Sequence, residues 1–299
     1  MPIASIINIC LGLLLAPLLL GIINKTKAFF AGRTGQPLFQ AYLDIIKQLR
    51  KGVVYSQTTS LIFRAGPVIG LASVLIALAI VPLGGVAAPL AFSGDLLIFA
   101  YILGLMRFFT VLAALDTGSS FEGMGASREV LFSALAEPAL LIGLAAIARE
   151  THAMSLSQML PAVSFLSPEV VLVTVALLIV YLCENARIPF DDPNTHLELT
   201  MIHEVMVLDH SGPDFAFILY GSALKLWVLG LVIIGIVFPA SSGSFWFISV
   251  ISAIGGLFFL AVIVGIIEST MARLRLIRIP QLLVAAGSLS LFAFILVLR

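Results

Sequence analysis

About eight separate runs of apolar residues, each roughly 20 residues long, constrain the fold of this chain more than any other feature. A helix of that length crosses about 30 Å of hydrocarbon, because it rises about 1.5 Å per residue. The alternating ten-residue segments of an outer-membrane barrel are absent. The sequence therefore predicts an all-α, polytopic membrane protein whose residues 1–299 form a single membrane domain. The predicted spans are 3–23, 63–83, 96–115, 130–148, 169–187, 215–238, 246–267 and 280–298.

Composition excludes two other classes of protein. The chain is 61% hydrophobic and 11% charged, whereas a soluble domain is about 25% charged. Its formal net charge is zero, and a nucleic-acid binder needs a basic surface that neutralises phosphates. The predicted surroundings are a lipid bilayer, with no nucleic acid.

The cysteines and histidines do not form the ligand set of a redox centre. Cys10 and Cys183 have neither metal-ligand nor CxxC spacing. No histidine lies inside a predicted span, and His196, His203 and His210 are spaced by seven rather than by three or four. We expect no cofactor, metal site or catalytic residue in this chain.

The positions of lysine and arginine predict the orientation. Four connections carry nearly all of them, so these connections are predicted to be cytoplasmic and both termini to lie outside. The basic residues on that side are Lys25, Lys27, Arg33, Lys47, Arg50, Lys51, Arg64, Arg128, Arg187, Arg273, Arg275 and Arg278. The opposite side has only Arg149 and Arg299.

Two cytoplasmic segments have patterns of their own. Residues 36–51 repeat apolar side chains at helical spacing, which predicts an amphipathic helix at the membrane surface or against a partner subunit. The loop 188–214 concentrates acids and histidines. In that loop, Asp192 followed by Pro193 is a good helix start, so we expect a helix that ends near Ser211 and Gly212. Its histidines titrate near neutrality and could pass protons.

Charged residues inside the predicted spans need partners or water, because each costs about 2.5–3.5 kcal/mol near the middle of a bilayer. Arg107, Glu137 and Lys225 are such residues, and Glu137 precedes Pro138. Asp116, Glu184 and Glu268 lie nearer the cytoplasmic ends. One interpretation is a buried polar track for protons or ions. The other is a set of interhelical ion pairs that fix packing, and the sequence leaves both open.

Several segments resemble a known family. PFDDPNTHLEL is similar to a segment of the heel subunit of respiratory complex I, the NADH dehydrogenase subunit 1 family, and GQPLFQAYLDIIKQLRK is similar to the surface helix of that subunit. LDTGSSFEGMGASRE, ALAEPALL and ENARIPFDDPNTHLELTMIHE resemble more closely a sister group, the membrane anchors of formate hydrogenlyase and hydrogenase-4 type complexes. Asn194 and His196 stand where the complex I subunit has acids, which favours the hydrogenase branch.

This resemblance implies a set of roles. Acids and a histidine of the loop would line a cavity under the redox arm, and intramembrane charges would form a proton path toward antiporter-like subunits. Three aspartates would contact docked subunits. The implied proton-path residues are Arg107, Glu137, Glu184, Asp191, Glu198, His203, Glu204 and Lys225. The implied docking residues are Asp44, Asp191 and Asp192.

The resemblance also implies the function. The chain would be a non-redox membrane anchor and proton- or ion-coupling subunit of a respiratory-type [NiFe]-hydrogenase complex in a prokaryotic plasma (inner) membrane, not catalytic alone. Its partners would be the hydrogenase large and small subunits, an iron–sulfur protein and antiporter-like membrane subunits. The [NiFe] centre and the iron–sulfur clusters would lie in those partners. Two alternatives stay open: a complex I heel subunit with a quinone site, and a stand-alone ion or solute transporter.

Overall fold

The structure is a computed structural model that describes residues 3–191, 201–239 and 245–299. The described residues form helices and connections, without a β-strand. The α-helices are α1 (Ile3–Phe30), α2 (Gln40–Leu49), α3 (Leu61–Ile80), α4 (Asp95–Asp116), α5 (Ser120–Thr151), α6 (Leu156–Ala162), α7 (Pro168–Glu184), α8 (Gly212–Val237), α9 (Trp246–Thr270) and α10 (Ile279–Leu298). Two 3₁₀ turns are η1 (Glu204–Val207) and η2 (Leu276–Arg278).

The predicted all-α, polytopic fold is confirmed. Among the described residues, seven helices are long and apolar enough to cross a membrane: α1, α3, α4, α5, α8, α9 and α10. The remaining predicted span corresponds to α7, whose 17 residues are at the short end of the length that crosses a bilayer. Every predicted span thus coincides with a helix.

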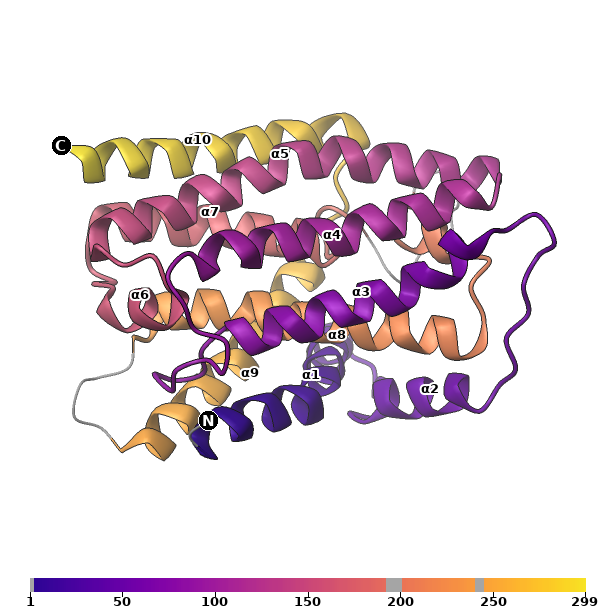
Figure 1. Cartoon of the computed structure of the whole chain (residues 1–299), viewed down its shortest axis with the longest axis horizontal. Helices are drawn as coiled ribbons and strands as arrows, with labels where there is room; N and C mark the ends of the chain where they lie inside the picture. Colours follow the sequence, from indigo (N-terminus) through magenta and orange to yellow (C-terminus); the bar gives the residue numbers. More distant parts are fainter. Residues whose placement is uncertain (1–2, 192–200, 240–244) are drawn as a thin grey trace.

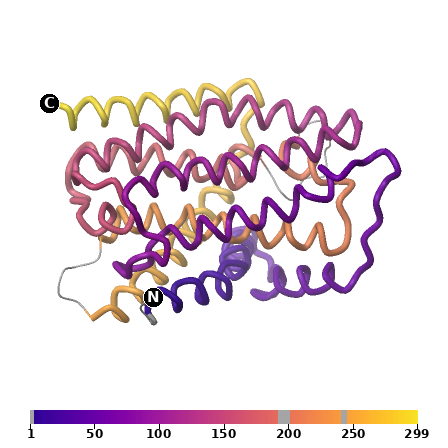
Figure 2. The backbone as a smooth tube through the Cα atoms, in the orientation of Figure 1, coloured from indigo at the N-terminus to yellow at the C-terminus, as the bar shows by residue number. Residues whose placement is uncertain are grey.

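Helices α3, α4, α5, α8 and α10 run roughly along the longest axis of the molecule, whereas α1 and α9 lie obliquely to it (Figure 1). Neighbours that are distant in sequence pack together, including α5 with α10, α1 with α9 and α3 with α8. The N- and C-termini lie in the same half of the bundle (Figure 2). The two termini therefore lie toward the same side, as the predicted topology requires, and which side that is stays a prediction.

The central helix of the bundle is α8. All residues from 223 to 234 are buried, which is typical of a helix that is apolar on every face and packed on every face. Lys225 lies inside this stretch. Its ammonium group must be paired within the protein, and this requirement leads to the functional site.

A proline at the middle of α1 leaves a carbonyl free to bind α8, and the next carbonyl binds α2. Pro17 has no N–H to donate to the carbonyl of Leu13. The hydroxyl of Tyr220 on α8 donates to that carbonyl at 2.8 Å, and the hydroxyl of Tyr42 on α2 donates to the next one, of Leu14. Helix α1 is thereby fixed to both α8 and α2.

A close contact strengthens this attachment. A Cβ atom at Gly21 would lie 2.0 Å from the carbonyl oxygen of Leu38, so no larger residue fits there without a shift of the backbone. Helix α2 accordingly packs along α8 and α1, and Figure 1 shows it beside the N-terminal half of α8.

The amphipathic helix predicted over 36–51 is present as the shorter α2. Its outward face is apolar, with Phe39, Leu43 and Ile46 exposed. Asp44, predicted to contact a hydrophilic subunit, is half-buried and accepts a hydrogen bond from the Gln40 amide at 2.9 Å. Its docking role stays a prediction.

The helix predicted from Asp192 starts at residues outside the described part, but its expected continuation to Ser211 is wrong. Met201, Ile202 and His203 are not helical, and η1 is a single 3₁₀ turn. The Asp191 carboxylate accepts hydrogen bonds from the backbone N–H groups of Ile202 and His203. In a helix, those two N–H groups would instead donate to backbone carbonyls.

Candidate functional site

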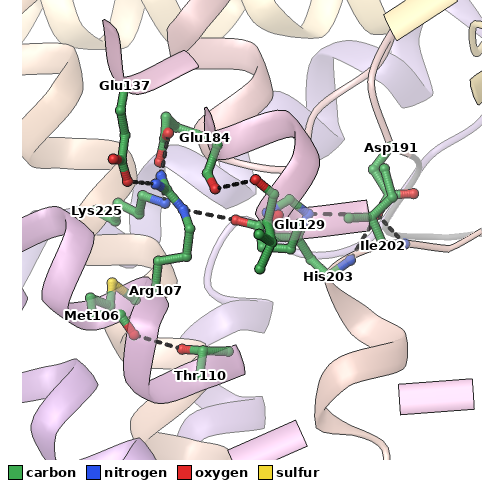
Figure 3. Close-up of polar contacts among 12 residues, drawn as sticks. Met106, Arg107, Thr110, Glu129, Glu137, Glu184, Asp191, Ile202, His203 and Lys225 are labelled. Atoms are coloured by element: carbon green, nitrogen blue, oxygen red, sulfur yellow. Dashed lines mark hydrogen bonds and ion pairs between the residues drawn. The ribbon is translucent and has the colours of Figure 1, made fainter. Parts of the chain in front are cut away.

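Arg107 is the centre of a buried charged cluster between α4, α5 and α7 (Figure 3). Its Nε lies 3.0 Å from Oε1 of Glu129, and its two terminal nitrogens contact Glu137 and Glu184. Glu129 and Glu137 are eight residues apart on α5, which places them on one face two turns apart. One guanidinium with a fixed fork of donors is suited to bind three carboxylates at once.

Lys225 extends the cluster to α8. Its Nζ lies 2.7 Å from Oε2 of Glu184, so Glu184 contacts both cations. Arg107, Glu184 and Lys225 are all buried. Ion pairing offsets the cost of their burial, which is several kcal/mol per isolated charge.

His203 connects the cluster to the loop that follows α7. Its Nε2 lies 3.1 Å from Oε2 of Glu129 and its Nδ1 lies 3.7 Å from Oδ2 of Asp191. Burial alone would lower the pKa of His203, but the negative charge of Glu129 and the contact with Asp191 outweigh it and raise that pKa. His203 is therefore stabilised in its charged form.

Asp191 holds the segment that carries His203. Its Oδ2 accepts the backbone N–H groups of Ile202 and His203 at 3.0 and 3.1 Å, and its Oδ1 lies 2.9 Å from Arg273 in the α9–α10 connection. Burial would raise the pKa of Asp191, but His203 and Arg273 lower it overall. Two connections far apart in sequence thus meet at one carboxylate.

A cavity of about 280 Å³ lies against this cluster. One wall is charged and the other is apolar, so the cavity has an amphipathic lining. The charged wall contains Arg107, Glu129, Glu184, Arg187, His203, Glu204 and Lys225. The apolar wall includes Leu20, Met106, Met206, Val207, Phe215, Ile218, Leu219 and Leu226.

The comparisons with known proteins agree with this architecture. A family model described as NADH dehydrogenase matches residues 3–298. The chain belongs to the NADH dehydrogenase family. Two relatives from Escherichia coli (strain K12) align over most of both chains. Hydrogenase-4 component C is 32% identical over 95% of this chain and 91% of its own length. Formate hydrogenlyase subunit 4 is 30% identical over 94% and 93%.

A solved structure shares the fold of this family member. A chain of the membrane-bound sulfane sulfur reductase, an archaeal respiratory membrane complex, superposes with a TM-score of 0.81 at 19% identity. The match covers 97% of this chain and 98% of that one. The two relatives place this family member among the membrane subunits of respiratory complexes, and its apolar helices make it a multi-pass protein of a prokaryotic plasma membrane.

Several predicted site residues of this NADH dehydrogenase family member converge. Arg107, Glu137, Glu184 and Lys225 form the cluster, while His203 and Asp191 extend it. Glu204 lines the cavity. Glu198 and Asp192 lie outside the described residues.

The polar track does not include every charge that was assigned to it. Asp116 accepts the backbone N–H of Ser60 at 2.6 Å at the start of α3. Glu268 pairs with Lys27 at 2.7 Å and with Arg187 at 3.4 Å. Asp116 thus contacts the start of α3, away from the Arg107 cluster, and Glu268 reaches the cavity through Arg187.

Glu129, which joins Arg107 to His203, is not among the predicted site residues. It lies just ahead of the predicted span 130–148, in what hydropathy alone indicates to be a connection. Its spacing of eight from Glu137, on the same helical face, is the signal that identifies it. Arg273, which contacts Asp191 from a loop 82 residues later in the chain, is likewise not among the predicted site residues.

His210, in the same segment as His203, has a different environment. Its ring stacks on Phe63 with centroids 3.9 Å apart and planes at 7°. Burial lowers the pKa of His210 to about 4, although Asp214 and Asp209 oppose that shift. This histidine is neutral at physiological pH. Within residues 3–191, 201–239 and 245–299, no group of three His, Cys, Asp or Glu side chains is arranged to hold a metal ion.

Proposed function

We propose that this chain is the non-redox membrane anchor and proton- or ion-coupling subunit of a [NiFe]-hydrogenase complex of the formate hydrogenlyase or hydrogenase-4 type. The observation that carries the proposal is the continuous series of contacts from the cytoplasmic loop to the side of the bundle. It runs from Asp191 through His203 and Glu129 to Arg107 and Glu137. The names of the two curated relatives support the type of complex.

The two ends of this series suit exchange with different partners. His203 and Glu129 line the cavity, and a cavity with a charged wall admits water. At the other end the Glu137 side chain is 44% exposed on α5. A carboxylate that faces lipid near the middle of a bilayer costs about 2.5 kcal/mol or more. We infer that a neighbouring membrane subunit covers Glu137, and antiporter-like subunits are the proposed partners.

The cytoplasmic end is the proposed docking side for the redox arm. The [NiFe]-hydrogenase large and small subunits and an iron–sulfur protein would bind there and would carry the [NiFe] centre and the iron–sulfur clusters. In the α9–α10 connection Ile277 is 83% exposed, and Arg275 and Arg278 flank it. Because Arg273 in the same connection pairs with Asp191, a subunit bound there would be mechanically linked to the charged cluster.

The docking role of Asp191 takes a specific form in this proposal. Its carboxylate is buried and holds Ile202, His203 and Arg273. Any effect of Asp191 on docking would therefore act through the segments that it holds in place. Asp44 and Asp192 stay proposed docking residues.

The amphipathic cavity favours one second candidate, the quinone-binding heel subunit. A volume of about 280 Å³ with one charged wall and one apolar wall is close to the size of small-molecule sites. Quinone-dependent activity of the assembled complex would support this candidate. The intramembrane charges that suggested a stand-alone transporter are accounted for by the cluster itself.

The proposal is tested with Glu137→Gln, which keeps the shape and hydrogen bonding of the side chain but removes its charge and its titration. We expect the complex to assemble, because Arg107 keeps two other carboxylates, and we expect coupled turnover to be impaired. Hydrogen evolution or uptake is measured together with ion translocation in membranes that carry the variant. Glu169→Gln, in the first turn of α7 at the opposite end from Glu184, is the matched control.

Two results would contradict the proposal. If Glu137→Gln assembles and retains full coupling, the cluster is a set of packing ion pairs. If the purified chain alone contains stoichiometric iron, haem or flavin, the non-redox role is wrong.

A further inference from the structure

The charges at the centre of the bundle do not balance. Five ionisable side chains from four helices contact one another there, and they comprise three carboxylates and two cations. They are Arg107, Glu129, Glu137, Glu184 and Lys225. If all five are ionised, the group has one negative charge in excess. An uncompensated charge inside a protein is costly, so the site favours one additional proton.

The geometry indicates where that proton is held. Glu184 already contacts both cations, and Glu137 is partly exposed on the side of the bundle. Glu129 has Arg107 at one oxygen and Nε2 of His203 at the other, 3.1 Å away. The two atoms are within ion-pair distance, but neither ring nitrogen of His203 makes an aligned hydrogen bond, so a rotation of the imidazole ring has to bring Nε2–H into line with the oxygen before a proton is shared.

We propose that the Glu129–His203 pair is the proton-binding site of this subunit. This inference deepens the proposed coupling function and rests on it. In the loaded state the proton is on Nε2, as an imidazolium beside a carboxylate. Transfer breaks the Nε2–H bond and forms an O–H bond on Oε2 of Glu129, which leaves a neutral imidazole and a neutral carboxylic acid. Proton number and total charge are the same before and after the step.

The charged surroundings of His203 favour the loaded state. Glu129 on α5 and Asp191 in the loop after α7 favour the imidazolium, whereas Lys225 on α8 opposes it. Arg107 on α4 acts through Glu129, and Arg273 acts through Asp191. Glu204 follows His203 in the chain and lines the same cavity, as does Glu184. The net effect is the raised pKa of His203 described above.

The cavity provides the route by which the proton exchanges. Glu129 and His203 are both part of its charged wall, and the His203 side chain is 26% exposed. Water in the cavity therefore reaches the pair directly. Arg107 and Glu184 line the same cavity, and what distinguishes Glu129 from Glu137 and Glu184 is its contact with both Arg107 and His203.

The experiment uses the purified complex with ring-¹⁵N-labelled histidine and records infrared difference spectra as a function of pH. Subtracting the spectrum of His203→Gln isolates the titration of His203 from the other histidines. We expect Glu129→Gln to lower the pKa of His203 by about 1–3 units, because it removes the nearest opposite charge. His152→Asn is the control: His152 is exposed beyond α5 with a positive φ of 53°, which asparagine tolerates.

The outcomes separate this inference from the function on which it rests. An unchanged His203 titration in Glu129→Gln overturns the proton site, whatever happens to coupling. A downward shift in Glu129→Gln together with full ion translocation in His203→Gln upholds the proton site and contradicts its role in coupling. A shift together with lost translocation supports both. If Glu129→Gln does not assemble, Glu129→Asp, which withdraws the carboxylate from His203, must lower the same pKa.

Discussion

Helix α4 carries two buried charged sites whose construction differs. At its start, the carboxylate of Asp95 accepts hydrogen bonds from the hydroxyl of Ser155 at 2.6 Å and from backbone N–H groups of Leu156 at 2.8 Å and Phe92 at 3.4 Å. These donors are all neutral. Twelve residues later, Arg107 is surrounded by three carboxylates, two of which, Glu129 and Glu184, line the cavity.

The difference shows that a buried charge alone does not identify a functional site. Asp95 is fully buried, and its fixed neutral donors tie the start of α4 to the start of α6. The Arg107 cluster has an excess of carboxylates and a neighbouring cavity, so its protonation can change. Asp95 therefore fits a structural role, and the proposed coupling role is kept for the Arg107 cluster.

The largest effect is expected for Arg107→Leu. This change leaves Glu129, Glu137 and Glu184 without their shared cation, and breaking a buried pair in this way costs about 3–5 kcal/mol. We expect little or no assembled complex, measured by its yield after solubilisation. If this variant assembles in normal yield and couples normally, the Arg107 cluster is no more important to coupling than the Asp95 site, and the proposed difference between them is wrong.

Asp191→Ala is expected to have the next largest effect. It removes the acceptor of two backbone N–H groups and the partner of Arg273, where hydrogen bonds to a charged group contribute about 1.5–3 kcal/mol each. We expect weaker docking of the hydrophilic subunits, measured as their loss from the membrane in increasing salt. Retention equal to that of the unaltered complex would contradict the proposed link between loop and cluster.

Asp95→Asn tests whether Asp95, at the start of α4, has only a structural role. The amide keeps one acceptor oxygen but loses the charge, so we expect a loss of about 1–2 kcal/mol in the stability of the complex. Turnover and ion translocation per assembled complex should not change. Impaired coupling in this variant would contradict the assignment of a purely structural role.

The smallest effect concerns His210. Its pKa is about 4 in the folded protein, below the ordinary value of 6.5, so the unfolded chain binds more protons between these values. Stability is therefore expected to fall as pH decreases from about 6.5 toward 4. His210→Gln should reduce this loss, measured by thermal denaturation of the complex at several pH values. An equal acid sensitivity in both proteins would contradict the prediction.

Hydropathy was sufficient to predict the helices, because each span must be apolar whatever it packs against. It predicted the ends of the helices less accurately. Helix α5 begins at Ser120 rather than near residue 130, because the charged residues Glu122, Arg128 and Glu129 give its first turns the composition of a connection. Intramembrane charge identified Arg107, Glu137, Glu184 and Lys225. The pairing among them was not predictable, because hydropathy does not specify how each helix is rotated about its axis.

The loop was harder to predict. Its capping residues indicated a helix, whereas Asp191 takes backbone N–H groups of Ile202 and His203 that a helix would use. That contact depends on Arg273 and on the packing of α5, which lie far away in the sequence. Local pattern does not contain this information.

The bond from Tyr220 to Leu13 has a consequence for the biogenesis of the protein. The two residues are 207 positions apart, and translation proceeds at about 5–20 residues per second. The carbonyl of Leu13 therefore waits about 10–40 s after its own synthesis before its native partner emerges from the ribosome. During that interval the carbonyl of Leu13 in the newly inserted helix lacks its native hydrogen bond. Water, a lipid headgroup or the insertion machinery must donate a temporary one. Helix α1 is thus made well before all of its hydrogen bonds can form.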